Sequence, residues 1–430
     1  MKKRWWIFAA AALILARFLL APNIIGYEVD MNFFRDWSAK LAEGGLKNIY
    51  SSGIYVDYPP VYLFVLYLLG NISRAFGLKA FETGYVILMK SPALLADIGL
   101  ALLAFYTTRK FSTQKSPYAL FVILLCPAIA INSVFWGQVD SIFVLFLMIS
   151  LIFVIQNKLP LASVFFTISV LTKPQALIFA PLLLFPFLAE TTTAKGWKTI
   201  GISAASAFMV MFLLCLPFAN TLNPFWIVEK IKSTMGAYKY LSLNAFNMYF
   251  IAGKNFIAEA TALPALDLSA SEAEKFWGAI KILVPVLVTA ATGLIWWKSG
   301  FRQASVFNRA KIIFFSGFLI MFTVFMLTPE MHERYSFPAL ICLYFAFAAS
   351  GNRLLIPLMC AISLTLFANC YWLLAYLKVG GGNWLALGNW INSHGQLFAC
   401  INLFALAYGY IITPIIIKLR GITTTKESSI

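Results

Sequence analysis

Apolar stretches recur along the whole of this 430-residue chain, separated by short polar segments. Many approach the roughly 20 residues that a helix needs to cross a hydrocarbon core about 30 Å thick. Membrane-spanning strands would show alternating polar residues, and these stretches do not. The pattern therefore predicts an all-α polytopic membrane protein with about 12 transmembrane helices. The predicted helices cover residues 5–21, 84–106, 118–132, 140–155, 159–171, 175–189, 198–218, 278–297, 311–327, 337–350, 354–376 and 395–417.

Residues 58–76 decide how many times the chain crosses. Their uninterrupted apolar part runs only from Val61 to Gly70, and runs of that length more often lie at the interface or re-enter. If this segment does not cross, seventeen basic residues face the cytoplasm and three occupy short outer loops. The seventeen are Lys2, Lys3, Arg4, Arg109, Lys110, Lys115, Lys158, Lys195, Lys198, Lys298, Arg302, Arg309, Lys311, Arg353, Lys418, Arg420 and Lys426, and the three are Lys173, Arg334 and Lys378. A crossing would turn the last fourteen of the seventeen outward. Because Lys and Arg favour cytoplasmic loops, we expect no crossing here and both termini in the cytoplasm.

This topology leaves two long outer segments, 22–83 and 219–277, within a single membrane domain that covers residues 1–430. In the first segment, Phe33, Phe34, Trp37 and Leu41 recur at helical spacing. We therefore expect two interfacial helices in this segment, one around 32–43 and one at 60–76. The first apolar run, 5–20, is interpreted as a retained anchor, because no small-residue cleavage pattern follows it.

Composition agrees with a membrane protein. The chain is 61% hydrophobic and 12% charged, against roughly 25% charged residues in a soluble domain. Its net charge of +16 comes from basic residues in short loops, so it requires no nucleic-acid partner. The six cysteines fall inside apolar segments and form no CxxC pair, which favours free thiols over disulfides or a metal site.

Ionisable residues gather in the loops assigned to the outer side. Such residues at membrane depth are costly and tend to mark a site. Asp30 is expected just before the first interfacial helix, where it either caps that helix or points into a site. Lys173 and Arg334 have the alternative of reaching towards the interface, and His332 and Glu333 that of an exposed loop pair. The further polar residues in these loops are Asp36, Gln138, Asp140, Gln175 and Glu330.

A second group of charges lies inside the second predicted span. Lys90 and Asp97 are seven residues apart, so they share a helical face. We interpret them as a structural buried pair that neighbours help to satisfy.

Several motifs resemble the GT-C glycosyltransferases. "VDMNFFRDWSAKL" followed by "VDYPPVYLFVLYLLG" is similar to the start of the dolichyl-phosphate-glucose-dependent glucosyltransferases of N-glycan assembly and their bacterial relatives. In that family an acidic residue early in the first luminal loop precedes a Trp and a D-Y-P-P motif, here Asp30, Trp37 and 57–60. "WGQVDS", "LTKPQALIFAPLLL" and "HERYSFPAL" follow in the family's order, and "SLNAFNMYF" is similar to bacterial members.

The resemblance covers roughly the first 180 residues and the loop at 328–340. It implies a GT-C fold with the active site on the periplasmic or extracellular side. It also implies a polyprenyl-phosphate-linked sugar as donor and a glycan or lipid-linked acceptor. Arg334 stands where the family has Lys, and 138–140 differs from the eukaryotic His- and Asn-rich loop, so the sugar stays open between glucose and mannose.

The implied roles fall on the outer-loop residues. Asp30 takes the position of the general base, and the donor phosphate would be bound by Arg334, His332 and Lys173. The remaining substrate-binding candidates are Asp36, Gln138, Asp140, Glu333 and Tyr58. No cofactor is required, because the cations neutralise a single phosphate, although the carboxylates leave a divalent metal possible.

Two other classes of function stay open at this point. A polytopic transporter or flippase would also carry polar residues among its helices, but more often shows inverted repeats and midplane sites. The sequence shows no such repeat. A structural or polymer-assembly membrane protein without catalysis is the third reading.

Overall fold

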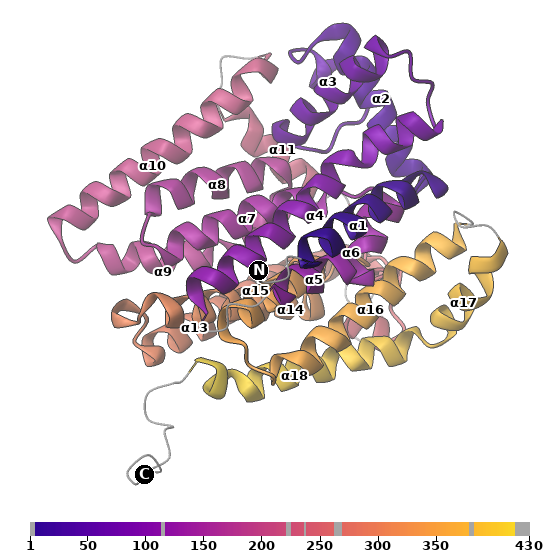
Figure 1. Cartoon of the computed structure of the whole chain (residues 1–430). Coiled ribbons are helices and arrows are strands. Elements are labelled where there is room, and N and C mark those ends of the chain that lie inside the picture. Colours follow the sequence, from indigo (N-terminus) through magenta and orange to yellow (C-terminus); the bar gives the residue numbers. More distant parts are fainter. Residues whose placement is uncertain are drawn as a thin grey trace.

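The protein is a bundle of helices, as the apolar pattern predicted. The computed structural model describes residues 5–112, 117–220, 225–235, 238–261, 269–377 and 382–417. Every predicted span is helical, and the long helices run side by side (Figure 1). These helices are α1 (Trp5–Leu20), α4 (Thr83–Phe111), α5 (Tyr118–Leu125) with α6 (Pro127–Ala130) and η3 (Ile131–Trp136), α7 (Asp140–Ile155), α8 (Leu159–Thr172), η4 (Pro174–Phe179) with α9 (Pro181–Glu190), α10 (Ala194–Cys215), α13 (Ala270–Ser299), α14 (Val306–Leu327), α15 (Phe337–Ser350), α16 (Leu355–Tyr376) and α18 (Gly395–Ile417).

Length and composition qualify seven of the described helices as membrane spans. The pair formed by 118–125 and 127–136 is bent by 50° and would make an eighth. The helices α7, α8, α9 and α15 are apolar but shorter, at 10 to 17 residues. The protein is therefore a multi-pass membrane protein built almost entirely of helices, and the count of 12 spans stays a prediction.

The first outer segment begins and ends at the same end of the bundle. Trp6 of α1 packs on Phe105 of α4, with 5.3 Å between ring centroids, while the opposite end of α1 lies beside Lys90. The two helices are thus antiparallel neighbours (Figure 1). Residues 22–83 leave and return at one end, as expected if 58–76 makes no crossing of its own. Some of the basic residues counted for the orientation, those at 1–4, 115 and 418–430 on the inner side and Lys378 on the outer side, lie outside the described residues.

Two helices form the core of this first segment, α2 (Glu28–Gly44) and α3 (Pro60–Ala75), with η2 (Ile49–Ser51) between them. The apolar stripe on α2 has a different cause from the one we expected. Phe34, Trp37 and Leu41 are almost fully buried against Tyr62 and other α3 residues rather than left for lipid. Helix–helix packing inside the protein therefore explains the periodicity, and a position at the membrane interface stays a prediction.

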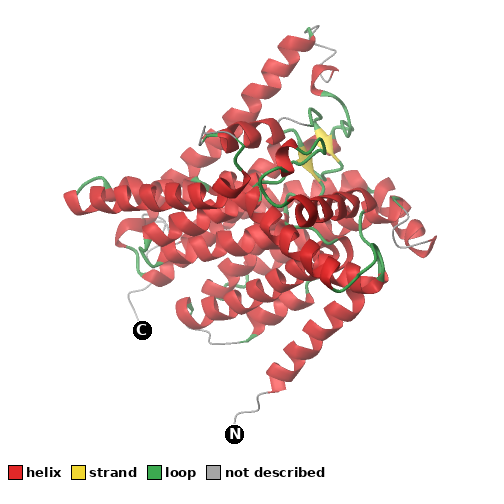
Figure 2. Cartoon of the chain, turned by 90° about the horizontal axis from the view of Figure 1, so that it is seen from above, coloured by secondary structure: helices red, strands yellow, loops and turns green. Residues whose placement is uncertain are grey.

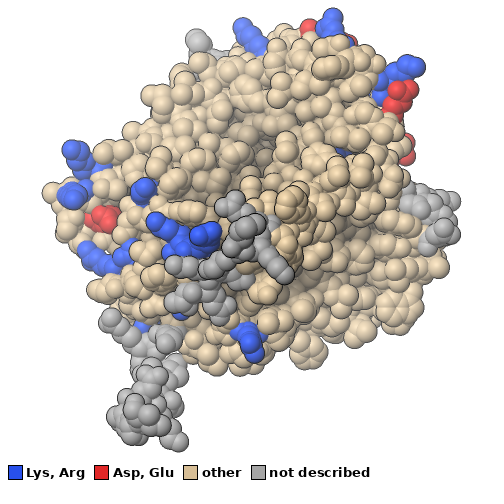
Figure 3. Space-filling model, viewed as in Figure 1, with Lys and Arg blue, Asp and Glu red and all other residues tan. Residues whose placement is uncertain are grey.

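The central helices of the bundle differ from the peripheral ones in burial. Most of α14 is buried, whereas α1, α10 and α13 are largely exposed and apolar. Extended apolar surfaces of this kind mark contact with a membrane or with another protein, and their length fits a membrane. The face seen in Figure 3 is largely uncharged, with Lys and Arg gathered over the α9–α10 turn and the end of α4. A mixed group of basic and acidic side chains lies over α2 and α3.

The second outer segment folds over one end of the bundle. It contains η5 (Leu216–Phe218), α11 (Trp226–Met235), β1 (Ser242–Leu243), α12 (Met248–Ile251) and η6 (Glu259–Thr261). The strand β1 pairs in parallel with β2 (Met331–His332), and both strands lie among loops in Figure 2. The chain further contains η8 (Phe301–Gln303) and α17 (Gly382–Ser393), a helix that the sequence pattern did not predict.

Two buried amides of the bundle hold this segment in place. Asn369 of α16 donates a hydrogen bond to the Asn244 carbonyl and accepts one from the Phe246 amide. Asn402 of α18 donates to the Phe246 carbonyl. Because β1 precedes these residues directly, the same bonds position the strand that pairs with His332.

Candidate active site

Asp30 lies in the first turn of α2, two residues inside the helix that we expected it to precede. Trp136 donates a hydrogen bond from Nε1 to Asp30 Oδ2 over 2.8 Å. Gln138 donates a second, from Nε2, to the same oxygen. Among the described residues both donors therefore reach Oδ2, which leaves Oδ1 as the carboxylate oxygen available to a substrate.

The backbone between α6 and α7 explains how Trp136 and Gln138 reach one carboxylate. Residues 131–136 form a π-helix, a rare element that is frequent at functional sites. Gly137 then takes φ +86°, a left-handed conformation that glycine adopts without strain. This turn ends the helix and re-aims the chain, so that two side chains on either side of it point to Asp30.

Next to Asp30, a series of ion pairs joins Lys173, Asp140, Arg334 and Glu333. Lys173 donates to Asp140 Oδ1, and both side chains are almost fully buried. Arg334 lies with its Nε 3.7 Å from Asp140 Oδ2 and donates from Nη1 to Glu333. His332 Nδ1 is 3.8 Å from Glu333 Oε2. We call Asp30, Asp140, Lys173, Glu333 and Arg334 the site cluster.

Aromatic rings form the walls around these charges. The Arg334 guanidinium lies over the Trp136 ring, 5.3 Å from its centroid, and Lys173 Nζ lies 5.6 Å from the Tyr335 centroid. Tyr238, from the second outer segment, packs edge-on against His332. Rings and cations in these arrangements attract one another, which favours fixed positions for both cations.

Exposure divides the site into two layers. Lys173, Asp140 and Glu333 are buried, while Asp30, His332 and Arg334 are partly exposed. A ligand arriving from outside would therefore meet Asp30, His332 and Arg334 first. Lys173 sits behind Asp140 and already binds it, so a direct contact between Lys173 and a phosphate has less support than one from Arg334.

The surroundings of the carboxylates change their affinity for protons. Burial raises the pKa of Asp30 above the usual aspartate value, although Arg334 and the Trp136 hydrogen bond oppose this effect. Burial also raises the pKa of Asp57, and the nearby Asp30 charge adds to it. For Glu333, burial again favours the neutral form, but the Arg334 charge outweighs it and the pKa falls to about 2.

Four buried polar atoms around the site cluster have no hydrogen-bond partner within the described residues. They are Gln138 Oε1, Asp140 Oδ2, Gln175 Oε1 and Arg334 Nε. Buried polar atoms are otherwise almost always bonded, because leaving one unpaired costs about 1–3 kcal/mol. Asp140 Oδ2 and Arg334 Nε face each other at 3.7 Å, a distance that gives an ion pair but no hydrogen bond. The two amide oxygens, Gln138 Oε1 and Gln175 Oε1, have no partner of either kind among the described residues and fit a site that binds a hydroxyl-bearing ligand.

The structure brings most of the predicted site residues together. Tyr58 packs on Phe34 and Trp37 of α2, the helix that carries Asp30. Asp36 does not join them, because it is exposed on the other side of α2 and pairs with Arg35 over 2.8 Å. A substrate contact of Asp36 therefore stays a prediction that the site geometry does not support.

Three further charged residues, Glu330, Lys90 and Asp97, have their partners outside the site cluster. Glu330 pairs with Lys281 of α13, which also binds Glu259, and so braces the loop that carries β2. Lys90 and Asp97 do not satisfy each other. Asp97 binds Arg17, and Lys90 binds only backbone carbonyls among the described residues.

Sequence reasoning missed Trp136, Asp57 and Tyr335. Trp136 stands within the quoted motif "WGQVDS", but no rule of spacing distinguishes an indole that bonds a carboxylate from one that packs. Asp57 stands within the D-Y-P-P motif, and Tyr335 accepts a hydrogen bond from Gln175 over 2.9 Å. Their contacts depend on the fold and not on neighbours in the sequence.

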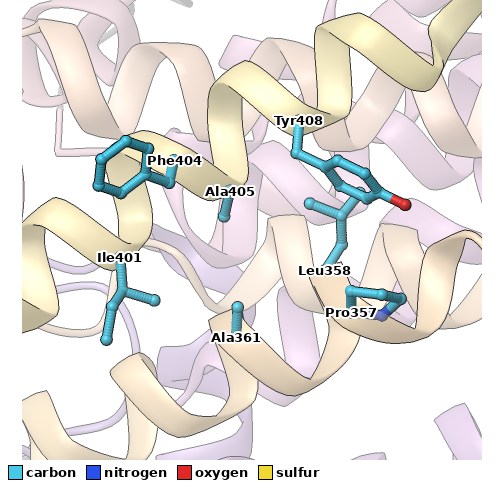
Figure 4. A pocket seen from close by; sticks show the side chains of 7 residues that line it. All are labelled: Pro357, Leu358, Ala361, Ile401, Phe404, Ala405 and Tyr408. Atoms are coloured by element: carbon cyan, nitrogen blue, oxygen red, sulfur yellow. The ribbon is translucent and has the colours of Figure 1, made fainter.

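In the part of the chain that the structure describes, no group of three or more His, Cys, Asp or Glu side chains is arranged to hold a metal ion. A reaction without a metal stays a prediction. Independently of the site, α16 and α18 form a shallow apolar groove of about 240 Å³ (Figure 4). Its lining is Pro357, Leu358, Ala361, Ile401, Phe404, Ala405 and Tyr408, none of which belongs to the site.

Comparison with known proteins adds one family match. Residues 17–237 match the sequence profile described as the ALG6, ALG8 glycosyltransferase family. A search of curated proteins gave no match. Among solved structures, ArnT from Cupriavidus metallidurans bound to undecaprenyl phosphate aligns with 11% identity and a TM-score of 0.38, over 96% of this chain and 79% of that one. Similarity at that level does not establish a shared function.

Proposed function

Because this chain belongs to the ALG6, ALG8 glycosyltransferase family, we propose that it moves a hexose, glucose or mannose, from a polyprenyl-phosphate donor to an acceptor hydroxyl. The acceptor is a glycan or glycolipid on the outer face of the membrane. The observation that carries the proposal is the position of Asp30, held by Trp136 and Gln138 beside Arg334. This arrangement places a base, Asp30, near a fixed cation, Arg334.

The base acts on the acceptor. With Oδ2 engaged by two donors, Asp30 Oδ1 accepts the proton of an acceptor hydroxyl, whose oxygen then attacks the anomeric carbon of the donor sugar. The attack comes from the face opposite the phosphate, the bond between that carbon and the phosphate oxygen breaks, and the configuration at the anomeric carbon inverts. A raised pKa makes Asp30 a stronger base than an ordinary aspartate, which favours proton transfer at this step.

The cations act on the leaving group. A polyprenyl phosphate gains a second negative charge as it departs, and fixed positive groups stabilise that charge most where water is excluded. Arg334 is partly exposed and carries a planar guanidinium group suited to phosphate, and His332 lies two residues before it. Lys173 holds Asp140, and Asp140 in turn faces Arg334, so Lys173 supports the position of the guanidinium.

We place this site on the outer side of the membrane because the basic loops then face the cytoplasm. Exposed residues at the two ends of the bundle test the orientation. Cysteines introduced at Lys110, at the end of α4, and at Ser393, before α18, should react with impermeant reagents from opposite sides of sealed vesicles. Reaction of both from one side would contradict the predicted topology, and reaction at position 110 from the outer side would contradict the orientation.

A single-turnover assay tests the activity. The purified protein in liposomes receives a short-chain polyprenyl-phosphate glucose or mannose, together with envelope lipids and glycans as acceptors. Mass spectrometry should show polyprenyl phosphate and one glycosylated product, and both should form about 10² to 10⁴ times more slowly with Asp30→Asn. Movement of intact donor across the bilayer, without a covalent change, would instead identify a lipid transporter. A chelator in a parallel reaction tests the expected independence from metal.

A further inference from the structure

Lys90 of α4 is fully buried and has an unusual set of partners. Its Nζ lies 2.6 to 2.9 Å from four backbone carbonyl oxygens, those of Ala21, Ile24, Val134 and Phe135. Among the described residues, no carboxylate pairs with it. An ammonium group has three N–H donors, so four acceptors at this distance use it completely.

These carbonyls come from the ends of two helices. Ala21 opens η1 (Ala21–Asn23), the turn that follows α1, and Ile24 comes directly after it. Val134 and Phe135 lie in the last turn of the π-helix. The last carbonyls of a helix have no partner inside it and carry the negative end of the helix dipole. A single cation placed between two such ends therefore binds both.

The two helix ends lead directly to the two halves of the candidate active site. Six residues after Ile24 comes Asp30, and the residue after Phe135 is Trp136, its hydrogen-bond donor. Gly26, at φ +114°, lies between Ile24 and Asp30 and packs closely on the segment that contains Trp136. A Cβ at position 26 would lie 2.4 Å from the Trp136 carbonyl oxygen. The two segments are thus in backbone contact at Gly26, and one ammonium group binds both of them.

We propose that Lys90 is a positioning residue for sugar transfer, because its ammonium group fixes the distance between the segment that carries Asp30 and the segment that carries Trp136 and Gln138. This inference rests on the proposed role of Asp30 as the base. Lys90 itself touches neither substrate nor the reacting atoms.

Loss of the ammonium group has a specific consequence. Four carbonyls would lose their partner, and the two helix ends would repel each other where they now share a cation. The hydrogen bonds from Trp136 and Gln138 to Asp30 span the same gap, so they would lengthen. A residue with a merely structural role would lower the amount of folded protein without changing these two bonds.

The first measurement needs no transferase activity. The protein is labelled with 5-fluorotryptophan, and the fluorine resonance that disappears in Trp136→Phe is assigned to Trp136. In the parent protein this resonance should titrate with Asp30, and the titration should vanish in Asp30→Asn. In Lys90→Met, which keeps the length of the side chain, the midpoint should move to higher pH, because the Trp136 hydrogen bond lowers the pKa of Asp30.

The second measurement uses the transfer assay. Misplacement of reacting groups by about 1 Å can cost about 10²-fold in rate, so Lys90→Met should lower kcat by up to about 10²-fold. The KM for the polyprenyl-phosphate donor should stay close to that of the parent, because Arg334 and His332 are untouched. Lys90→Gln, which retains one donor group, should lie between the two. The losses from Lys90→Met and Trp136→Phe should combine to less than their product, since both act through one hydrogen bond.

The control is Ser150→Ala, which removes a buried hydrogen bond to the Ala162 carbonyl far from the site. It should lower the melting temperature without moving the Trp136 midpoint. An unchanged midpoint and a parental kcat in folded Lys90→Met or Lys90→Gln protein would overturn the inference, as would a parent resonance that does not titrate with Asp30. Absence of transfer by the parent, with the shift in midpoint intact, would overturn the proposed function alone.

Discussion

Two groups of buried charges lie within this bundle, and they differ in how completely they are bonded. The first is the α4 charge set, defined as Arg17, Lys90 and Asp97. Asp97 binds Arg17, Ser133 and Ser141, and Lys90 has four carbonyls. The second is the site cluster, where Asp140 and Arg334 keep buried atoms without hydrogen-bond partners in the described chain.

This difference separates a structural role from a chemical one. A buried charge that is fully bonded stabilises one arrangement of helices, and its loss leaves the partner unpaired at a cost of about 3–5 kcal/mol. A buried charge with unused bonding capacity costs free energy in the ligand-free protein and regains it when a ligand binds. Loss of Arg17 should therefore affect mainly stability, and changes in the site cluster mainly rate. Lys90 differs from Arg17, because the two segments that it binds carry Asp30 and Trp136 and its loss should lower the rate as well.

The largest expected effect is that of Asp30→Asn. The amide keeps the shape and the contacts of the side chain but removes its basicity, so kcat should fall by about 10² to 10⁴. Donor binding should persist, because Arg334 and His332 are unchanged. The measurement is single-turnover transfer together with binding of the donor lipid.

Asp36→Asn is the matched control for this change. Asp36 occupies the same helix but is exposed and paired with Arg35, so its loss should leave the rate close to that of the parent. Near-normal turnover in Asp30→Asn, with an inactive Asp140→Asn or Asp57→Asn, would show that another carboxylate is the base.

The second prediction concerns the α4 charge set. Arg17→Met leaves the buried Asp97 with its two serine partners only, and the folded state should lose about 3–5 kcal/mol. Turnover per folded molecule should change far less, since Ser133 and Ser141 still hold Asp97 beside the π-helix. Thermal unfolding and rate are measured on the same sample.

Arg35→Met provides the comparison for Arg17→Met. It breaks an ion pair whose side chains are 37% and 51% exposed, and such pairs contribute only about 0–1 kcal/mol. Equal losses of stability from both substitutions would mean that burial does not distinguish the two pairs.

The third prediction concerns the donor phosphate. Arg334→Ala removes a charged hydrogen-bond donor, a contact that contributes about 1.5–3 kcal/mol, so kcat/KM for the donor should fall roughly tenfold to hundredfold. Arg334→Lys should be milder, because it keeps the charge and loses the planar geometry. Lys173→Ala should also lower stability, since it leaves Asp140 buried and unpaired.

The exposed Lys239, paired with Glu274, is a suitable control at the same end of the bundle. Its replacement by alanine removes one positive charge without touching the site. If Lys239→Ala reduces kcat/KM as much as Arg334→Ala does, the effect of Arg334 is general attraction rather than a contact with phosphate.

The sequence predicted the helices well because apolar runs of membrane length have few alternatives to a helix. It also predicted which loops meet. The number of predicted spans between the loops that carry Asp30, Gln138, Lys173 and Arg334 places all four on the same side of the membrane. Partners were harder to predict. The α2 stripe of Phe34 and its neighbours has the same periodicity whether it packs on lipid or on α3.

Pairing inside the membrane was the least predictable feature. Lys90 and Asp97 share a helical face, yet each bonds to a different segment, because the carbonyls of helix ends compete with a carboxylate for the ammonium group. Backbone acceptors leave no mark in a sequence. The π-helix that directs Trp136 towards Asp30 was equally hard to predict, because the apolar pattern of residues 131–136 does not distinguish it from an α-helix.

The smallest effect expected is a shift in the pH dependence of the reaction, and it distinguishes two carboxylates. The base must be ionised, so kcat/KM should decline as the pH falls through the pKa of that group. Burial raises the pKa of Asp30, which places the decline at a higher pH than an ordinary aspartate would give. Glu333, with a pKa of about 2, stays ionised throughout this range and adds no step of its own.

Asp57 is the rival, because burial and the charge of Asp30 raise its pKa as well. If Asp30 is the base, Asp57→Asn should keep the decline and move it to slightly lower pH, since the repulsion that Asp30 exerts on Asp57 is mutual and is lost in this variant. Arg334→Ala should move it the opposite way, because the guanidinium lowers that pKa. A decline that disappears in Asp57→Asn would assign proton transfer to Asp57 and leave Asp30 to orient the acceptor.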